Sequence, residues 1–107
     1  MERHLQLVNV RPELRDRYLQ LHSAVWPAVQ TRLTASNITN YSIFIEQDLL
    51  ISYFEYVGDD FKADMSRIAA DPVTRDWWKH TDPCQVPLDG APSGAIWTDA
   101  REVWHLP

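Results

Sequence analysis

Alternating apolar and polar positions along the chain predict four β-strands. The first strand lies near the N-terminus, where the segment HLQLVNV alternates as a strand with one buried face does. Two further runs are rich in β-branched and aromatic residues, and only Gln47 and Asp48 separate them, which predicts a hairpin. The predicted strands cover residues 4–10, 41–46, 49–56 and 101–106.

Apolar residues at helical spacing lie between the first strand and the hairpin. Pro12 suits the first turn of a helix, and residues 13–25 carry apolar side chains three or four positions apart. Pro27 begins a further helical turn, after which residues 37–40 are turn-like. The inward-facing positions predicted here are Leu14, Tyr18, Leu21, Val25, Ala28, Val29 and Leu33.

A second helical region follows the hairpin. Asp60 is a suitable N-cap for a helix whose apolar stripe includes Phe61, and Asp71-Pro72 has the N-cap and first-turn proline of another short helix. Residues 80–98 hold three prolines and two glycines, which predicts an irregular loop before the last strand.

The order of these elements is β-α-β-β-α-β, which is the α+β arrangement called ferredoxin-like. Helices cover one face of an antiparallel sheet in this arrangement, and in so short a chain a second copy is the natural cover for the other face. The chain has 107 residues, no internal repeat and no low-complexity tract. Residues 1–107 are therefore expected to form one domain.

Composition narrows the class of protein. The formal charge is −5 and the pI about 5.2, which argues against nucleic-acid or anionic membrane surfaces as partners. Cys84 is the only cysteine, so no internal disulfide is possible. The first ten residues do not resemble a signal peptide, and no apolar run approaches the roughly 18 residues of a membrane span. We therefore expect a soluble cytoplasmic protein.

Three side chains that could take part in binding or catalysis recur every fourth residue: Tyr18, His22 and Trp26. On one helix they would lie on a single face, with neighbours about 40° apart. A histidine flanked by aromatic rings suits acid–base chemistry on an uncharged ligand with hydroxyl groups and C–H faces, such as a sugar. Spacing alone leaves two roles open for His22, a catalytic group or a hydrogen-bonded structural histidine.

Other aromatic residues are candidates for the same kind of site. Trp77 and Trp78 diverge by about 100° on a helix, so that one ring can bury while the other lines a pocket. Tyr41 opens what we expect to be the central strand, on the face of Ile43 and Ile45. The alternative is that all three aromatic rings fill the core.

The sequence offers little for other chemistries. The four histidines are scattered and no paired-cysteine motif occurs, so a metal site is not expected. The three glycines form no phosphate-binding loop, and no serine lies in a nucleophile-elbow pattern. Two other functions remain compatible with the element order: a small oxygenase of the dimeric α+β barrel type, and a non-catalytic sugar-binding module.

Five ordered motifs carry a resemblance to a known family. They are Tyr18-x-x-x-His22, Val25-Trp26-Pro27, Asn40-Tyr41-x-Ile43, Asp76-Trp77-Trp78-Lys79 and Glu102-Val103-Trp104-x-Leu106-Pro107. In this order, and almost from end to end, the chain resembles the L-rhamnose mutarotase family. The resemblance implies a homodimeric α+β barrel that interconverts the α and β anomers of a 6-deoxy sugar without a cofactor. The sugar is expected to be L-rhamnose, with L-fucose as the alternative.

The same resemblance assigns roles to five residues. His22 matches the proton donor of the family, and Tyr18, Tyr41 and the Trp77-Trp78 pair match positions that contact the substrate. Trp26 is expected to pack and to end its helix instead.

Overall fold

The computed structural model describes all residues from 1 to 107. A three-residue 3₁₀ turn, η1, precedes α1, and a second one, η2, follows α4. The elements in chain order are β1 (Glu2–Val10), η1 (Pro12–Leu14), α1 (Arg15–His22), α2 (Pro27–Ala35), β2 (Ile38–Glu46), β3 (Leu49–Tyr56), α3 (Phe61–Ala70), α4 (Pro72–Thr81), η2 (Asp82–Cys84), β4 (Gln85–Val86) and β5 (Thr98–Ala100).

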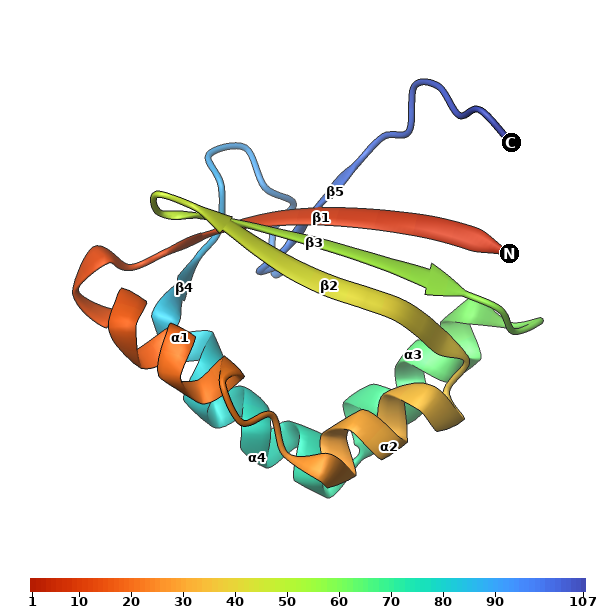
Figure 1. Ribbon diagram of the computed structural model, residues 1–107, viewed down its shortest axis with the longest axis horizontal. Coiled ribbons are helices and arrows are strands. Elements are labelled where there is room, and N and C mark those ends of the chain that lie inside the picture. The colour runs from red at the N-terminus through yellow and green to blue at the C-terminus, as the bar shows by residue number, and fades with distance from the viewer.

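The strands form one antiparallel sheet in the order β2-β3-β1-β4, and β5 also pairs with β1. This is the ferredoxin-like order, with the fourth strand divided in two. β4 pairs with the end of β1 at Asn9 and Val10, and β5 pairs with its middle at Leu5–Leu7. All four α-helices lie on one side of the sheet (Figure 1). The predicted α+β fold class is confirmed.

Strand alternation determines which side chains face the helices. Along β3 the even-numbered residues are buried and the odd-numbered ones are partly exposed, because successive side chains point to opposite faces of a sheet. Val8 and Val10 on β1 follow the same rule and pack in a core cluster with Leu50, Tyr18 and Cys84. The helix-facing side of the sheet therefore carries the core, and Tyr18 from α1 packs against it.

The helix starts agree with the sequence signals. The Asp60 carboxylate accepts a hydrogen bond from the backbone N–H of Ala63 at 3.1 Å, and Asp71 accepts one from Thr74 at 3.0 Å. Each bond satisfies an N–H group that has no partner within its own helix. The hairpin between β2 and β3 is also confirmed, with Gln47 in the left-handed region at φ 52°.

A buried carboxylate joins the far end of β3 to α3 and to the turn before β2. Asp64, which is 5% exposed, accepts hydrogen bonds from the Tyr56 hydroxyl at 2.5 Å and from the Asn37 amide at 2.9 Å. Its other oxygen accepts from Arg67 at 2.5 Å. These donors lower the pKa of Asp64, the Tyr56 bond most of all. The carboxylate holds three segments together.

Three expectations about element boundaries and strand position are wrong. The helix predicted over residues 13–25 ends at His22, Ser23 and Ala24 form a turn, and Trp26 before Pro27 is extended with ψ 131°. Trp26 therefore does not share one helix with His22, and it precedes α2 instead of ending α1. Tyr41 lies on β2, which is an edge strand and not the central one.

The last strand also differs from its prediction. β5 covers Thr98–Ala100, and residues 101–107, which were expected to form a strand, have no regular structure. Apolar and polar residues do alternate in this segment. However, the pairing with β1 ends at Ala100, and the tail leaves the sheet there. Figure 1 shows it leading away on the side opposite the helices. No helix in the structure has the length and apolar character needed to cross a membrane.

Candidate active site

His22 is the last residue of α1, and one of its ring nitrogens has a fixed partner. Nδ1 lies 3.0 Å from the carbonyl oxygen of Tyr18, one helical turn earlier. Because a carbonyl oxygen can only accept, Nδ1 is the donor and carries the proton. In the neutral ring Nε2 is then a lone-pair acceptor, which is the form a general base requires.

Burial keeps this imidazole neutral. The pKa of His22 is lowered from 6.5, because desolvation disfavours the cation, although the bond to the Tyr18 carbonyl acts in the opposite direction. The residue is neither fully buried nor fully exposed. His22 is therefore a neutral base near physiological pH, and a ligand can reach it.

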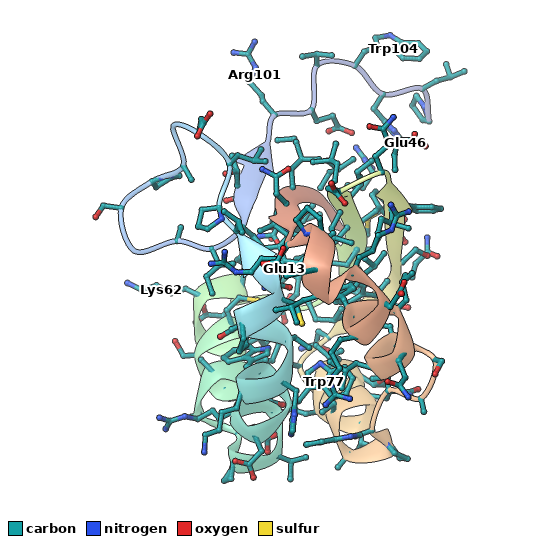
Figure 2. All side chains as sticks on the ribbon, turned by 90° about the vertical axis from the view of Figure 1, so that its left-hand side faces the viewer. Glu13, Glu46, Lys62, Trp77, Arg101 and Trp104 are labelled. Atoms are coloured by element: carbon teal, nitrogen blue, oxygen red, sulfur yellow. The ribbon has the colours of Figure 1, made fainter.

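Aromatic rings surround His22 on two sides. Tyr18 stacks on it with ring centroids 4.2 Å apart, and Trp77 from α4 meets it edge-on at 5.4 Å. Trp26 in turn meets Trp77 edge-on at 5.3 Å. Figure 2 shows Trp77 in the interior among the helices. The structure thus brings Tyr18, His22 and Trp77 together, and Trp26 packs behind them.

The phenols of Tyr18 and Tyr41 lie close enough for Tyr41 to raise the pKa of Tyr18. Tyr18 is 2% exposed, and desolvation together with the neighbouring Tyr41 raises its pKa far above the ordinary value. Desolvation also raises the pKa of Tyr41, although 42% of that residue remains accessible. A group that is surrounded by protein and still reachable suits contact with a ligand. Both phenols stay protonated near neutrality, so they donate hydrogen bonds and do not act as bases.

Trp78 lies elsewhere. It is 36% exposed and lines a shallow hollow of about 570 Å³ with Arg75, Lys79, Asp82 and Pro83. It makes no ring contact with His22, Tyr18 or Trp77. The expected divergence of two adjacent tryptophans is therefore observed, with Trp77 turned inward. The substrate contact predicted for Trp78 is not part of the His22 cluster in this structure.

One polar residue of this region was missed by the sequence interpretation. Ser52 on β3 is fully buried on the helix-facing side. The sequence does contain a signal for this residue, because Ser52 occupies an inward position between Leu50 and Phe54, where an apolar residue is expected. No long-range partner is visible in sequence, however, so this signal does not by itself indicate a site.

The chemistry that this arrangement supports is proton transfer. His22 is a base with one nitrogen free of protein partners, the two phenols are hydrogen-bond donors, and the buried Trp77 ring borders His22. Cys84 is buried, its pKa is raised by burial, and its Sγ lies 3.5 Å from the His80 carbonyl oxygen. That environment disfavours the thiolate that a nucleophile needs. The structure brings no three His, Cys, Asp or Glu side chains together as metal ligands.

Comparison with known proteins gives a consistent result. A family model described as L-rhamnose mutarotase matches residues 3–106. An L-rhamnose mutarotase of Lactiplantibacillus plantarum is 31% identical over 102 residues, which cover 94% of both chains. One from Listeria monocytogenes is 29% identical over 106 residues and 99% of both chains.

Solved structures support the fold. The crystal structure of an L-rhamnose mutarotase from Formosa agariphila covers 100% of both chains with a TM-score of 0.77 at 20% identity. Tetracenomycin F2 cyclase from Streptomyces glaucescens, a type-II polyketide cyclase, also covers 100% of both chains, with a TM-score of 0.69 at 14% identity. At such identities the two structures establish the shared fold and nothing about the reaction.

Proposed function

The chain belongs to the L-rhamnose mutarotase family of isomerases, and on that premise we propose that it interconverts the α and β anomers of L-rhamnose with His22 as the acid–base group. The observation that carries the proposal is the neutral imidazole whose Nδ1 is held by the Tyr18 carbonyl at 3.0 Å. Its other nitrogen is left for a ligand.

The reaction moves one proton between two oxygens of the sugar. His22 Nε2 takes the proton of the anomeric hydroxyl, a proton is delivered to the ring oxygen, and the C1–O5 bond breaks to give the open-chain aldehyde. Rotation about C1–C2 and closure on the other face complete the exchange. Both oxygens are bonded to C1, so a single imidazole can serve them in turn as base and then as acid.

The neighbouring groups orient the sugar in this proposal. The Tyr18 and Tyr41 phenols donate to sugar hydroxyls, and Trp77 faces the apolar side of the ring with its C6 methyl group. Unassisted anomer exchange is already moderately fast, so positioning and proton transfer suffice. The mechanism uses no cofactor. The contact predicted for Trp78 stays a prediction.

The choice of sugar is tested by exchange spectroscopy on a panel. Saturation transfer between the anomeric protons is measured for L-rhamnose, L-fucose and D-glucose with equal amounts of enzyme. We expect the largest acceleration over buffer for L-rhamnose. A larger acceleration for L-fucose would keep the mechanism and change the substrate, whereas equal acceleration of all three sugars would argue against a fitted site.

The pH dependence of the reaction follows from the lowered pKa of His22. The base is lost when the imidazole is protonated, and because its pKa is lowered from 6.5, the midpoint of that loss lies below pH 6.5. We expect kcat/KM, corrected for buffer exchange, to stay level from about pH 8 to neutrality and to fall on the acid side. An acid limb with its midpoint above 6.5 would contradict the assignment.

A homodimer is the assembly we propose, and the C-terminal tail supplies the structural support. Val103, Trp104 and Leu106 are 83, 75 and 72% exposed, on a tail that extends beyond the uncovered sheet face (Figure 1). Figure 2 shows Trp104 far from Trp77, clear of the body of the protein. Phe44 is 59% exposed on the sheet face away from the helices. Apolar side chains so exposed are typical of an interface.

The dimer is tested by sedimentation at micromolar concentration. Trp104→Glu is expected to shift the protein from dimer toward monomer, because a charge replaces an apolar anchor. The matched control is Leu19→Glu, since Leu19 is 43% exposed but lies on α1 in the helical layer. A monomeric wild type, or a Trp104→Glu variant as dimeric as the wild type, would contradict the role of the tail in the dimer interface.

The cytoplasmic location and the single domain stay predictions.

A further inference from the structure

Ser52 carries a buried hydroxyl group that has no hydrogen-bond partner. The residue lies in the middle of β3 and is 0% exposed, yet Oγ makes no hydrogen bond. A buried hydroxyl without a partner costs free energy, and an alanine at this position would avoid that cost. Such a group in a strand core therefore calls for a role outside folding.

The β2–β3 hairpin brings Tyr41 close to Ser52. Ser52 is paired with Ile43 across the two strands, and Tyr41 lies two residues before Ile43, within the register shift between Thr39 and Ser42. The Tyr41 ring packs against Phe54 with centroids 5.5 Å apart. Phe54 is the next residue after Ser52 on that face of β3, so the Tyr41 side chain lies across this pair.

Electrostatics at Tyr41 agree with this placement. The Ser52 hydroxyl acts to lower the pKa of Tyr41, against the larger effect of desolvation. A neighbouring hydroxyl has that effect when its O–H points at the phenolic oxygen, because it stabilises the phenolate. The two oxygens therefore lie close to each other, and their contact lacks the geometry of a full hydrogen bond.

We propose that Ser52 is a positioning residue of the sugar site: its hydroxyl donates to the Tyr41 phenolic oxygen when the sugar binds, and thereby directs the Tyr41 O–H at a sugar hydroxyl. The inference rests on the proposed function and extends it to a residue outside the family motifs. A phenol that accepts one hydrogen bond is a stronger donor in the next, so the pair acts as a short relay. The buried hydroxyl is then satisfied in the complex.

The kinetic test compares Ser52→Ala with the wild type. We expect KM for L-rhamnose to rise about threefold to tenfold, the usual effect of one lost neutral hydrogen bond, with kcat within about twofold. The melting temperature should stay level or rise, because the variant removes an unsatisfied group. In a Tyr41→Phe background the same substitution should have no further effect on KM, since the phenol through which it acts is gone.

Thr98→Val is the matched control. Thr98 Oγ1 is the other buried side-chain oxygen without a hydrogen-bond partner, and it lies on β5, away from Tyr41. Its removal should leave KM unchanged. An unchanged KM in Ser52→Ala, an equal rise in Thr98→Val, or a full effect of Ser52→Ala without Tyr41 would each overturn the proposal.

A readout that does not need catalysis separates this inference from the proposed function. The ¹³Cζ resonance of Tyr41, assigned by its loss in Tyr41→Phe, should differ between Ser52→Ala and the wild type, and the difference should grow on addition of L-rhamnose. Identical resonances with and without sugar would overturn the inference even if the enzyme is active. If the resonances differ while the wild type accelerates no exchange, the proposed function fails and the coupling of the two side chains stands.

Discussion

Replacing His22 by glutamine is expected to leave the fold intact and to lower the catalysed rate of L-rhamnose anomer exchange by about 10²–10⁴-fold, the usual contribution of a positioned acid–base group. Glutamine keeps a polar side chain of similar length, but no proton on it titrates near neutrality. The stacked Tyr18 and the edge-on Trp77 remain in place to bind sugar. Saturation-transfer NMR measures the rate, and fluorescence titration measures the affinity.

His80→Gln is the matched control for this experiment. His80 lies exposed on α4 and meets Trp26 edge-on at 5.6 Å, and it makes no ring contact with His22. It should retain exchange within about twofold of the wild type. Wild-type exchange in His22→Gln, or an equal loss in both variants, would remove His22 from the acid–base role.

Replacing Asp64 by alanine is expected to cause the largest loss of stability among single substitutions outside the site. The change leaves the hydroxyl of Tyr56 and the amide of Asn37 without their acceptor, and it frees Arg67. Buried donors that lose a charged acceptor are costly. We expect the melting temperature to fall by roughly 10 °C or more, measured by circular dichroism or calorimetry.

The control for this prediction is Asp76→Ala. Asp76 forms an ion pair with Lys79 at 3.2 Å on the surface of α4, and exposed pairs of this kind contribute little. A similar fall in both variants would show that general surface charge, and not the buried network, is responsible.

The stability due to Asp64 should also depend on pH. Its folded-state pKa is lowered from 3.8, so the folded protein binds this proton less readily than the unfolded chain. The stabilisation is present above pH 3.8 and is lost as the pH falls through the lower folded value. The difference between Asp64→Ala and the wild type should accordingly shrink at acidic pH. A constant difference would contradict the role of the charge.

Local signals in the sequence predicted the elements well because their causes are local. Asp60 and Asp71 start helices through their own side chains, and both bonds are present. The hairpin at Gln47 and Asp48 follows from the short gap between two apolar runs. Pro27 marks the start of α2, but it restricts only Trp26 before it and does not determine that α1 ends at His22.

Features that depend on distant parts of the chain were not readable in this way. The contact of Trp77 with His22 joins α4 to α1, and the sequence left open which of the two tryptophans turns inward. The tail after Ala100 alternates like a strand, but alternation does not show whether a neighbouring strand is free to pair. The orphan hydroxyl of Ser52 becomes apparent only when the register with β2 is known.

The carbonyl that fixes the His22 tautomer is a further feature of the structure alone. A four-residue spacing predicts that Tyr18 and His22 are neighbours, and they are. It does not predict that Nδ1 turns back to the Tyr18 backbone and leaves Nε2 for a ligand. That detail converts a histidine with two open roles into a base with a defined orientation.

Mutarotase activity is measured by saturation transfer between the two anomeric protons of L-rhamnose in the presence of the wild-type protein at neutral pH. We expect an exchange rate above that of buffer that grows in proportion to enzyme concentration. A rate that stays at the buffer value while titration shows that the sugar is bound would contradict it, and would leave a sugar-binding protein in place of a mutarotase.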